Sequence, residues 1–432
     1  LAILIYRIAR HIGIGTGDMG VAGVITAADV KTVATSATLT KQTIFNVSRN
    51  TDLTLQNMTL EGGNGATIIT SNSYAVKTLT VDNVIFDGGV QTSKVANDGN
   101  GGLISGIRYT NIVANDSIFR FGYTMAQGGA IYVTTANNGG YASPLNITNA
   151  LFDRNYAAGN GGALSLGNSA ASATIVDSTF IDNYSNANGG AIYQTGSTTA
   201  NGNLIAINST FVNNAAKTAG GAYYMNKGTD FTGQAVFINS TLYKNMVGET
   251  ANDVATNGTT VALLNSYYSV VSDGVDATAS QQITDVTNQF AANGESLFFT
   301  TTIDGVEYTY MKPADNTANG NLVVYDSAAK TLTAGETTVT LNKTLTTTAS
   351  DALSVDLLGN SREIAAGKYS FGAVNGEITA SEPVTTEVTL DWTIDDSYIY
   401  NGNDQTVTVK VLDGEGREVD GLTVTLTYND AA

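Results

Sequence analysis

The sequence predicts an all-β protein, a right-handed parallel β-helix (a β-solenoid) that a smaller β-domain follows. Three observations predict it. One sequence motif recurs four times between residues 145 and 245. Apolar residues alternate with polar ones before each copy. The 432 residues include 46 Gly but only 3 Pro. Fixed internal spacing with variable insertions elsewhere is typical of a repeat architecture, and short strands with Gly-rich turns are typical of all-β proteins.

The first half of the motif begins with Asn or Asp and has a large apolar residue three positions later. It occurs eight times and therefore predicts eight coils: Asn57/Leu60, Asn83/Phe86, Asp116/Phe119, Asn149/Phe152, Asp177/Phe180, Asn208/Phe211, Asn239/Leu242 and Asn265/Tyr268. The second half is Gly-Gly-Ala, as at Gly161-Gly-Ala163, and the fourth copy has Ala251-Asn-Asp253 in its place. Gly-Gly supplies positive φ where the chain enters the next strand.

Period-2 alternation predicts which side chains point inward. The residues two and four positions before each Asn or Asp are almost all apolar, as in Leu204 and Ala206. The Asn or Asp shares their parity, so we expect it on the inner side of a bend, with Asp116 and Asp177 accepting from backbone or hydroxyl donors. A second column is expected to form a structural ladder, because stacked Asn side chains can pair along the column: Asn155, Asn183, Asn214 and Asn245.

Residues 1–28 form an uncertain N-terminal segment. We prefer a cap, or a chain that begins mid-protein, to a signal-peptide remnant, because Asp18 interrupts the apolar run. The parallel β-helix is expected over 29–380, with a less regular section at 290–350, and Glu382-Pro383 marks a boundary. Clean alternation from Val384 predicts a further β-domain at 384–432.

At this point the motifs resemble a known family. Phe-x-x-Asn at 152–155, 180–183 and 211–214, with Gly-Gly-Ala-Ile/Leu at 128–131, 161–164 and 189–192, resembles the repeats of the chlamydial polymorphic outer-membrane proteins and related bacterial surface β-helix proteins. The resemblance covers about residues 50–270 and implies a secreted, adhesin-like protein at the cell surface. Gly122 replaces Asn after Phe119, and the chain carries no outer-membrane barrel sequence, so autotransport is not implied.

Two further stretches carry resemblances. The run Asp356-Leu-Leu-Gly-Asn-Ser-Arg362 is similar to the closing signature of many extracellular bacterial β-helix domains, which extends the helix to about residue 380. Tyr400-Asn-Gly402 and Asp413-Gly-Glu-Gly416 resemble bacterial immunoglobulin-like repeats. About 49 residues follow Pro383, fewer than such a sandwich needs. We therefore expect a truncated immunoglobulin-like domain inside a longer, multi-repeat protein.

Composition excludes several functions. The net charge of −18 repels phosphate backbones, so we expect no nucleic-acid partner. One His and no Cys argue against His-based metal sites, and we expect no cofactor and no metal. No window of 18 uninterrupted apolar residues occurs, so no transmembrane helix is expected.

The candidate binding residues are Tyr132, Tyr193 and Tyr224, which share one position after the Gly-Gly-Ala motif, with Ser165 between them. They alternate with the inward-facing Ile131 and Ile192, so we expect their side chains on the outer surface of the β-helix. There an aromatic column can contact a glycan or a protein of a host or neighbouring cell. The alternative is that loops cover them as a minor outer core. We expect binding without catalysis and name no catalytic residue.

The rival function is a carbohydrate-active β-helix enzyme, a polysaccharide lyase or glycosidase. It needs clustered carboxylates, often with Arg or Lys, on neighbouring coils. Arg154 and Asp182 are candidate rung neighbours, which we interpret as a solvated ladder pair, and Asp153 and Asp182 stand at different offsets from their anchors. The prediction is therefore an extracellular adhesin-like or structural surface module, not an enzyme.

Overall fold

The computed structural model divides the chain into two compact units, Leu1–Thr379 and Ala380–Ala432, which are described separately. The structure describes residues 45–47, 52–61, 67–72, 77–91, 100–107, 110–134, 143–167, 171–196, 202–229, 231–258, 261–283, 298–303, 306–311, 321–355, 361–369, 389–392 and 409–412. Residues 1–28 lie outside these ranges. No helix in the described ranges is long and apolar enough to span a membrane.

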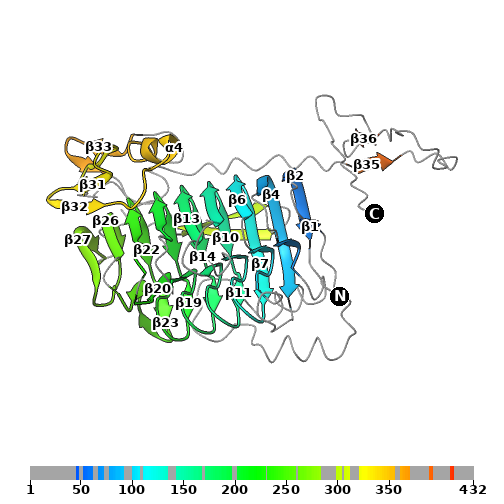
Figure 1. Ribbon diagram of the computed structural model, residues 1–432, viewed down its shortest axis with the longest axis horizontal. Helices are drawn as coiled ribbons and strands as arrows, with labels where there is room; N and C mark the ends of the chain where they lie inside the picture. Colours follow the sequence, from blue (N-terminus) through cyan, green and yellow to red (C-terminus); the bar gives the residue numbers. More distant parts are fainter. Residues whose placement is uncertain are drawn as a thin grey trace. The chain divides into compact units, whose positions relative to one another are not determined.

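The first unit is a parallel β-solenoid, as predicted (Figure 1). One face is an eight-stranded parallel sheet: β1 (Phe45–Val47), β3 (Ile69–Asn72), β5 (Ile104–Ile107), β8 (Ile131–Thr134), β12 (Leu164–Gly167), β16 (Ile192–Gly196), β20 (Tyr223–Lys227) and β25 (Val254–Thr256). We call this the Gly-Gly face, since most of its strands follow a Gly-Gly pair.

The other strands of the solenoid form a second, bent sheet. Its longer strands are β2 (Leu53–Glu61), β4 (Lys77–Gln91), β6 (Thr110–Asn115), β9 (Ser143–Thr148), β13 (Ala171–Val176), β17 (Leu204–Ile207), β21 (Ala235–Ile238), β26 (Val261–Tyr268) and β27 (Val275–Gln282). Beyond the bend lie β7 (Ile118–Thr124), β10 (Leu151–Asp153), β11 (Tyr156–Ala157), β14 (Thr179–Ile181), β15 (Tyr184–Ser185), β18 (Thr210–Val212), β19 (Ala215–Ala216), β22 (Thr241–Tyr243) and β23 (Met246–Val247). β24 (Thr250–Ala251) pairs antiparallel with β23.

The predicted apolar anchors form one column inside the solenoid. Each pairs in register with the anchor of the next coil, from Leu60 through Phe86 and Phe211 to Tyr268. The five Phe rings stack 4.5–5.0 Å apart and are fully buried. This confirms the repeat phase, since one slip of register would turn the column to the opposite face.

The Asn/Asp column at the first bend has positive φ, between 47° and 52°, from Asn83 to Asn265. That conformation suits Asn and Asp, whose side chains bond locally. The prediction that this column faces inward is wrong. The Asn208 amide donates to the Asp177 carboxylate at 2.9 Å and to the carbonyl of Ala352 at 2.6 Å, which lies over the outer surface. The left-handed backbone at the bend turns the Asn208 side chain outward. The inward and outward alternation of the preceding strand therefore does not continue to this residue.

The two carboxylates of this column accept from Asn amides of the following coil, donors that the sequence interpretation did not include. Asn149 donates to Asp116, and Asn208 to Asp177. Directly after the bend, buried Ser residues form a further ladder: Ser209 Oγ accepts from the Ser178 backbone and donates to the Ile207 carbonyl. The Asn-Ser-Thr tripeptides are therefore structural elements of the bend.

The inner Asn ladder is confirmed. Asn155, Asn183 and Asn214 each donate from Nδ2 to the Oδ1 of the next Asn at 2.8–2.9 Å. The same Oδ1 atoms accept from the backbone N–H of the preceding coil's Asn, and every ladder side chain is buried. Each amide thus satisfies groups that burial would otherwise leave unpaired.

Asp253 ends the ladder. Its Oδ1 accepts from the Asn245 side chain at 2.8 Å, and its Oδ2 accepts from the backbone N–H groups of Ser269 and Val270. Asp253 is fully buried. Burial raises the pKa of its carboxyl to about 7, against the lowering effect of these donors. The segment that stands in place of Gly-Gly-Ala in the fourth copy therefore caps the ladder, through Asp253.

Parallel coil pairing extends to β27, which ends at Gln282. The described strands after it, up to Tyr369, pair antiparallel, although we expected parallel coils to about residue 380. They are β28 (Phe298–Ile303), β29 (Val306–Met311), β30 (Val323–Asp326), β31 (Thr331–Ala334), β32 (Thr337–Thr340), β33 (Glu363–Ala365) and β34 (Lys368–Tyr369), and a short helix, α4 (Thr347–Asp351), follows β32.

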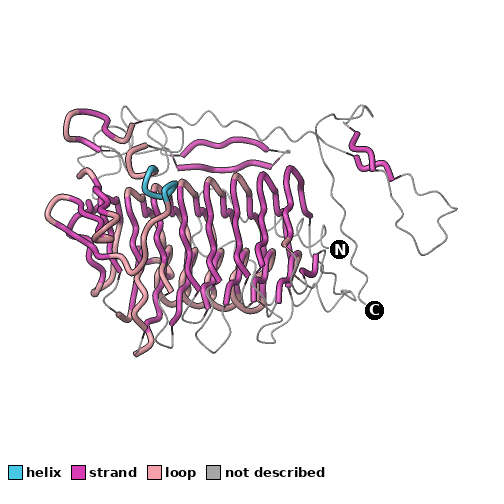
Figure 2. The backbone as a smooth tube through the Cα atoms, turned by 45° about the horizontal axis from the view of Figure 1, so that its top comes forward, coloured by secondary structure: helices cyan, strands magenta, loops and turns pink. Residues whose placement is uncertain are grey.

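The β30–β32 sheet and α4 pack on the outside of the solenoid (Figure 2). They cover a second apolar cluster, in which Ile205, Ile207 and Ile238 of the coils meet Leu332 and Leu345. The Asn342 side chain also donates to the carbonyl of Thr232 at 2.7 Å. The outward residues of these coil strands are apolar because this layer buries them.

In the second unit, the described residues form a small antiparallel sheet of β35 (Thr389–Trp392) and β36 (Val409–Leu412). These strands contain Leu390, Val409 and Val411 of the predicted alternation. The rest of the predicted domain 384–432 lies outside the described residues.

Candidate binding surface

The predicted Tyr column lies on the Gly-Gly face. Tyr132, Ser165, Tyr193 and Tyr224 pair in register across β8, β12, β16 and β20. The Tyr193 and Tyr224 rings stack with centroids 6.1 Å apart and an interplanar angle of 9°. The strands therefore bring the column together as the spacing predicts.

The side chains of the Tyr column are less exposed than the predicted binding surface requires. Tyr132 and Tyr193 are only 7% and 6% exposed, and Tyr224 is partly exposed. The rings lean onto the following coil: a Cβ built on Gly167 would lie 3.0 Å from the Tyr132 hydroxyl, and the Tyr193 hydroxyl accepts from Asn226 at 3.2 Å. Two members of the column are therefore buried against the following coil. Burial raises the pKa of Tyr132.

Tyr224 retains an accessible side chain. Its neighbour in the next coil is Ala255, which is too small to continue the stack. Burial, and then the neighbouring Tyr193, raise the pKa of Tyr224, so the phenol stays protonated at neutral pH. A ring that one coil supports and the next does not cover offers aromatic surface to a ligand.

Two amides lie beside this ring. Asn257 donates to the Asn226 side chain at 2.9 Å, and Asn226 donates in turn to the Tyr193 hydroxyl. We call Tyr224, Asn226 and Asn257 the Tyr224 platform. It combines an aromatic ring with amide groups, each of which has both donor and acceptor capacity. The Gly-Gly motif predicted the ring, but neither Asn.

The structure contains a second aromatic column, which we did not predict from the sequence. The rings of Tyr123, Tyr156 and Tyr184 stack with centroids 4.8 and 5.6 Å apart. Tyr156 and Tyr184 each follow a ladder Asn directly, which was the available signal. Ala215 occupies the next coil and ends this column as well. Burial raises the pKa of Tyr184.

Arg154 and Asp182 are rung neighbours, as expected, because Asp153 pairs with Ile181 directly before them, but Arg154 forms its ion pair with Asp153. Arg154 donates from Nε to its chain neighbour Asp153 at 2.8 Å and lies over the Phe121 ring, 4.7 Å from its centroid. One coil earlier, Arg120 pairs with Asp87 at 2.6 Å. Asp153 is only 2% exposed, so this arrangement is a buried ion pair and not a solvated ladder.

Asp182 adjoins this charged group. Burial, and then the charge of Asp153, raise the pKa of Asp182 to about 7, while Arg154 and a hydrogen bond with Asn213 oppose the rise. Its Oδ1 is buried and has no hydrogen-bond partner among the residues that the structure describes. The backbone at Asp182 has a positive φ of 56°. A carboxyl group of this kind can hold a proton near neutral pH.

In the part of the chain that the structure describes, no group of three or more His, Cys, Asp or Glu residues could hold a metal ion. No protein-family model, no curated protein and no solved structure matches this chain.

Proposed function

We propose that the chain is an adhesin-like or structural module of an extracellular cell surface, which binds a glycan or a protein of a host or neighbouring cell without catalysis. The proposal includes the right-handed form of the β-helix, because parallel β-crossovers are right-handed in nearly all proteins. It also includes an immunoglobulin-like identity for 384–432 and a domain boundary near Glu382-Pro383. The surface repeats of polymorphic outer-membrane proteins, which the motifs resemble, support the same role.

The Tyr224 platform is the observation that carries the proposal. Its ring is partly exposed on a continuous parallel sheet, and Asn226 and Asn257 lie beside it. A sugar ring stacks on an aromatic face while the amides bond its hydroxyls. Each such contact is worth about 1 kcal/mol, so repeated copies of the module at a surface provide avidity.

The second candidate function is a carbohydrate-active enzyme of the β-helix class. The observation that favours it is Asp182, whose pKa of about 7 would suit a general acid, with Asp153 and Arg154 adjacent. Burial opposes it, because Asp153 and Asp182 are 2% and 8% exposed and a polymer must reach both carboxyl groups.

Binding of the chain to a glycan array and to cells tests the proposal. We expect wild type to bind and Tyr224→Ala with Asn226→Ala to lose at least tenfold in affinity, while Tyr184→Ala, a partly exposed Tyr of the other column, retains it. Circular dichroism should be the same for all three. Release of sugar from pectin or related polymers by wild type, and its loss in Asp182→Asn, would instead establish the enzyme.

A further inference from the structure

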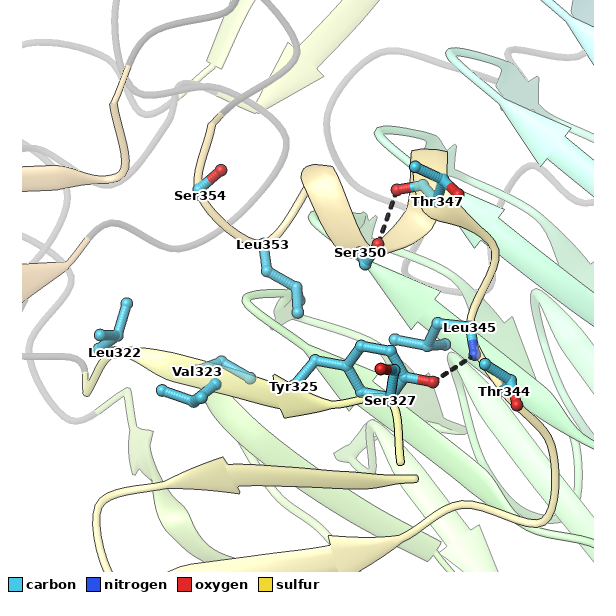
Figure 3. A pocket seen from close by; sticks show the side chains of 11 residues that line it. Leu322, Val323, Tyr325, Ser327, Thr344, Leu345, Thr347, Ser350, Leu353 and Ser354 are labelled. Atoms are coloured by element: carbon cyan, nitrogen blue, oxygen red, sulfur yellow. Dashed lines mark hydrogen bonds between the residues drawn. The ribbon is translucent and has the colours of Figure 1, made fainter. Parts of the chain in front are cut away.

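A groove separates β30 from the segment that carries α4. It has a volume of about 570 Å³ and is bounded by β30 on one side and by residues 344–354 on the other (Figure 3). It belongs to the layer outside the solenoid, so it shares no residue with the Tyr224 platform.

β30 is an edge strand. Its sheet has the order β30-β31-β32, so β31 pairs with one side of β30 and no described strand pairs with the other. An edge strand presents unpaired backbone N–H and C=O groups, which are a template for another strand. In Figure 3, α4 lies across the groove from β30.

The side chains of β30 alternate as a docking edge requires. Leu322, directly before β30, and Val324 are 47% and 54% exposed, whereas Val323 between them is buried. These two residues are the most exposed of the large hydrophobic side chains in the described ranges. Exposed apolar side chains at an open edge indicate an interaction site or an aggregation hazard.

The opposite wall is held in place. Leu345 and Leu353 are anchored in the apolar cluster against the solenoid, and the Thr346 side chain caps α4 by accepting from the Ala349 backbone. The Tyr325 hydroxyl accepts from the Leu345 backbone at 2.9 Å and joins the two walls at one end. The groove is therefore preformed, which lowers the entropic cost of binding.

The lining is uncharged in a chain with a net charge of −18. It combines Leu and Val side chains with hydroxyl groups, and none of the lining residues carries a charge at neutral pH: Leu322, Val323, Val324, Tyr325, Ser327, Thr344, Leu345, Thr347, Ser350, Leu353 and Ser354. Burying a charged side chain here would be costly, because none of the lining residues offers an opposite charge.

We propose that this groove binds an extended, uncharged segment of a partner protein, which adds to β30 as a further strand. The backbone of the segment pairs with the open edge of β30. Its alternate apolar side chains pack on Leu322 and Val324, and its polar side chains meet the hydroxyls of Thr344 and Thr347. Strand addition at a sheet edge is a common mode of peptide recognition.

The test uses the full chain and a synthetic peptide, acetyl-Leu-Thr-Val-Thr-Leu-Thr-Val-amide. We expect the peptide to slow amide exchange in residues 322–326 at least tenfold. Val324→Lys should weaken binding at least tenfold, since Lys on an edge opposes strand pairing. Val270→Lys is the matched control, because Val270 is 37% exposed and lies outside the groove. A second peptide with Pro at its central position should bind at least tenfold more weakly.

Three results would overturn the proposal. Equal binding of the Pro peptide would remove the role of backbone pairing, and equal binding by Val324→Lys would place the peptide elsewhere. The third is self-association of wild type that Val324→Lys abolishes in sedimentation, which would assign the groove to a second copy of the chain. Loss of glycan or cell binding in the Tyr224 variants bears only on the separate surface function.

Discussion

The side-chain amide of Asn245 donates to the buried carboxylate of Asp253 at 2.8 Å, and this bond closes the Asn ladder of the solenoid. Every Asn of the ladder both donates and accepts, whereas an ionised carboxylate only accepts. Asp253 therefore ends the chain of donors that begins at Asn155. Its second oxygen accepts from the turn at Ser269 and Val270, and so it ties the last coil to the ladder.

We expect Asp253→Asn to destabilise the C-terminal coils by about 1–3 kcal/mol. The new amide can still accept from Asn245, but its NH₂ group faces the N–H groups of Ser269 and Val270, which are donors themselves. Amide exchange at these two residues measures the effect. Asp273→Asn is the control, because it makes the same change at an exposed position in the adjacent turn. Unchanged exchange in Asp253→Asn would show that the carboxylate is not the cap.

The anchor column and the ladder should differ in energetic cost. Phe180→Ala leaves a cavity in a fully buried stack and should cost about 3–5 kcal/mol. Asn183→Ala removes the acceptor of Asn155 and the donor to Asn214, and should cost about 1–3 kcal/mol. Because solenoid stability is largely a sum of nearest-neighbour terms, limited proteolysis near residues 175–220 should report both losses. Negligible change in both variants would place neither residue in the core.

Asp182 predicts a pH dependence of stability. Its pKa is about 7 in the folded chain against an ordinary 3.8. The folded state thus binds the proton more tightly, so this contribution to the free energy of unfolding is complete below about pH 4 and is lost as the pH rises to 7. Urea unfolding at pH 4.5 and 7.5 should show a smaller difference in Asp182→Asn than in wild type. A difference as large in the variant as in wild type would contradict the assignment, and Asp273→Asn controls for the removed charge.

The sequence determined the phase of the coils, because its signals are local and recur. The three-residue step from Asn208 to Phe211 recurs from coil to coil, and inside the solenoid each coil packs on its neighbours. The Phe column and the Asn155–Asn245 ladder therefore follow from spacing alone. The position of Tyr224 on the Gly-Gly face was predictable for the same reason.

Only the tertiary structure decided how much of that surface is open. Tyr193 and Tyr224 have the same local sequence position, yet one is covered and the other is partly exposed, because side chains of the next coil differ. Parity could not show the outward turn of Asn208, since a left-handed bend interrupts it. The β30 groove also lay beyond prediction. It depends on residues 321–355 folding back over Ile205 and Ile207, and no periodic pattern encodes a contact across more than a hundred residues.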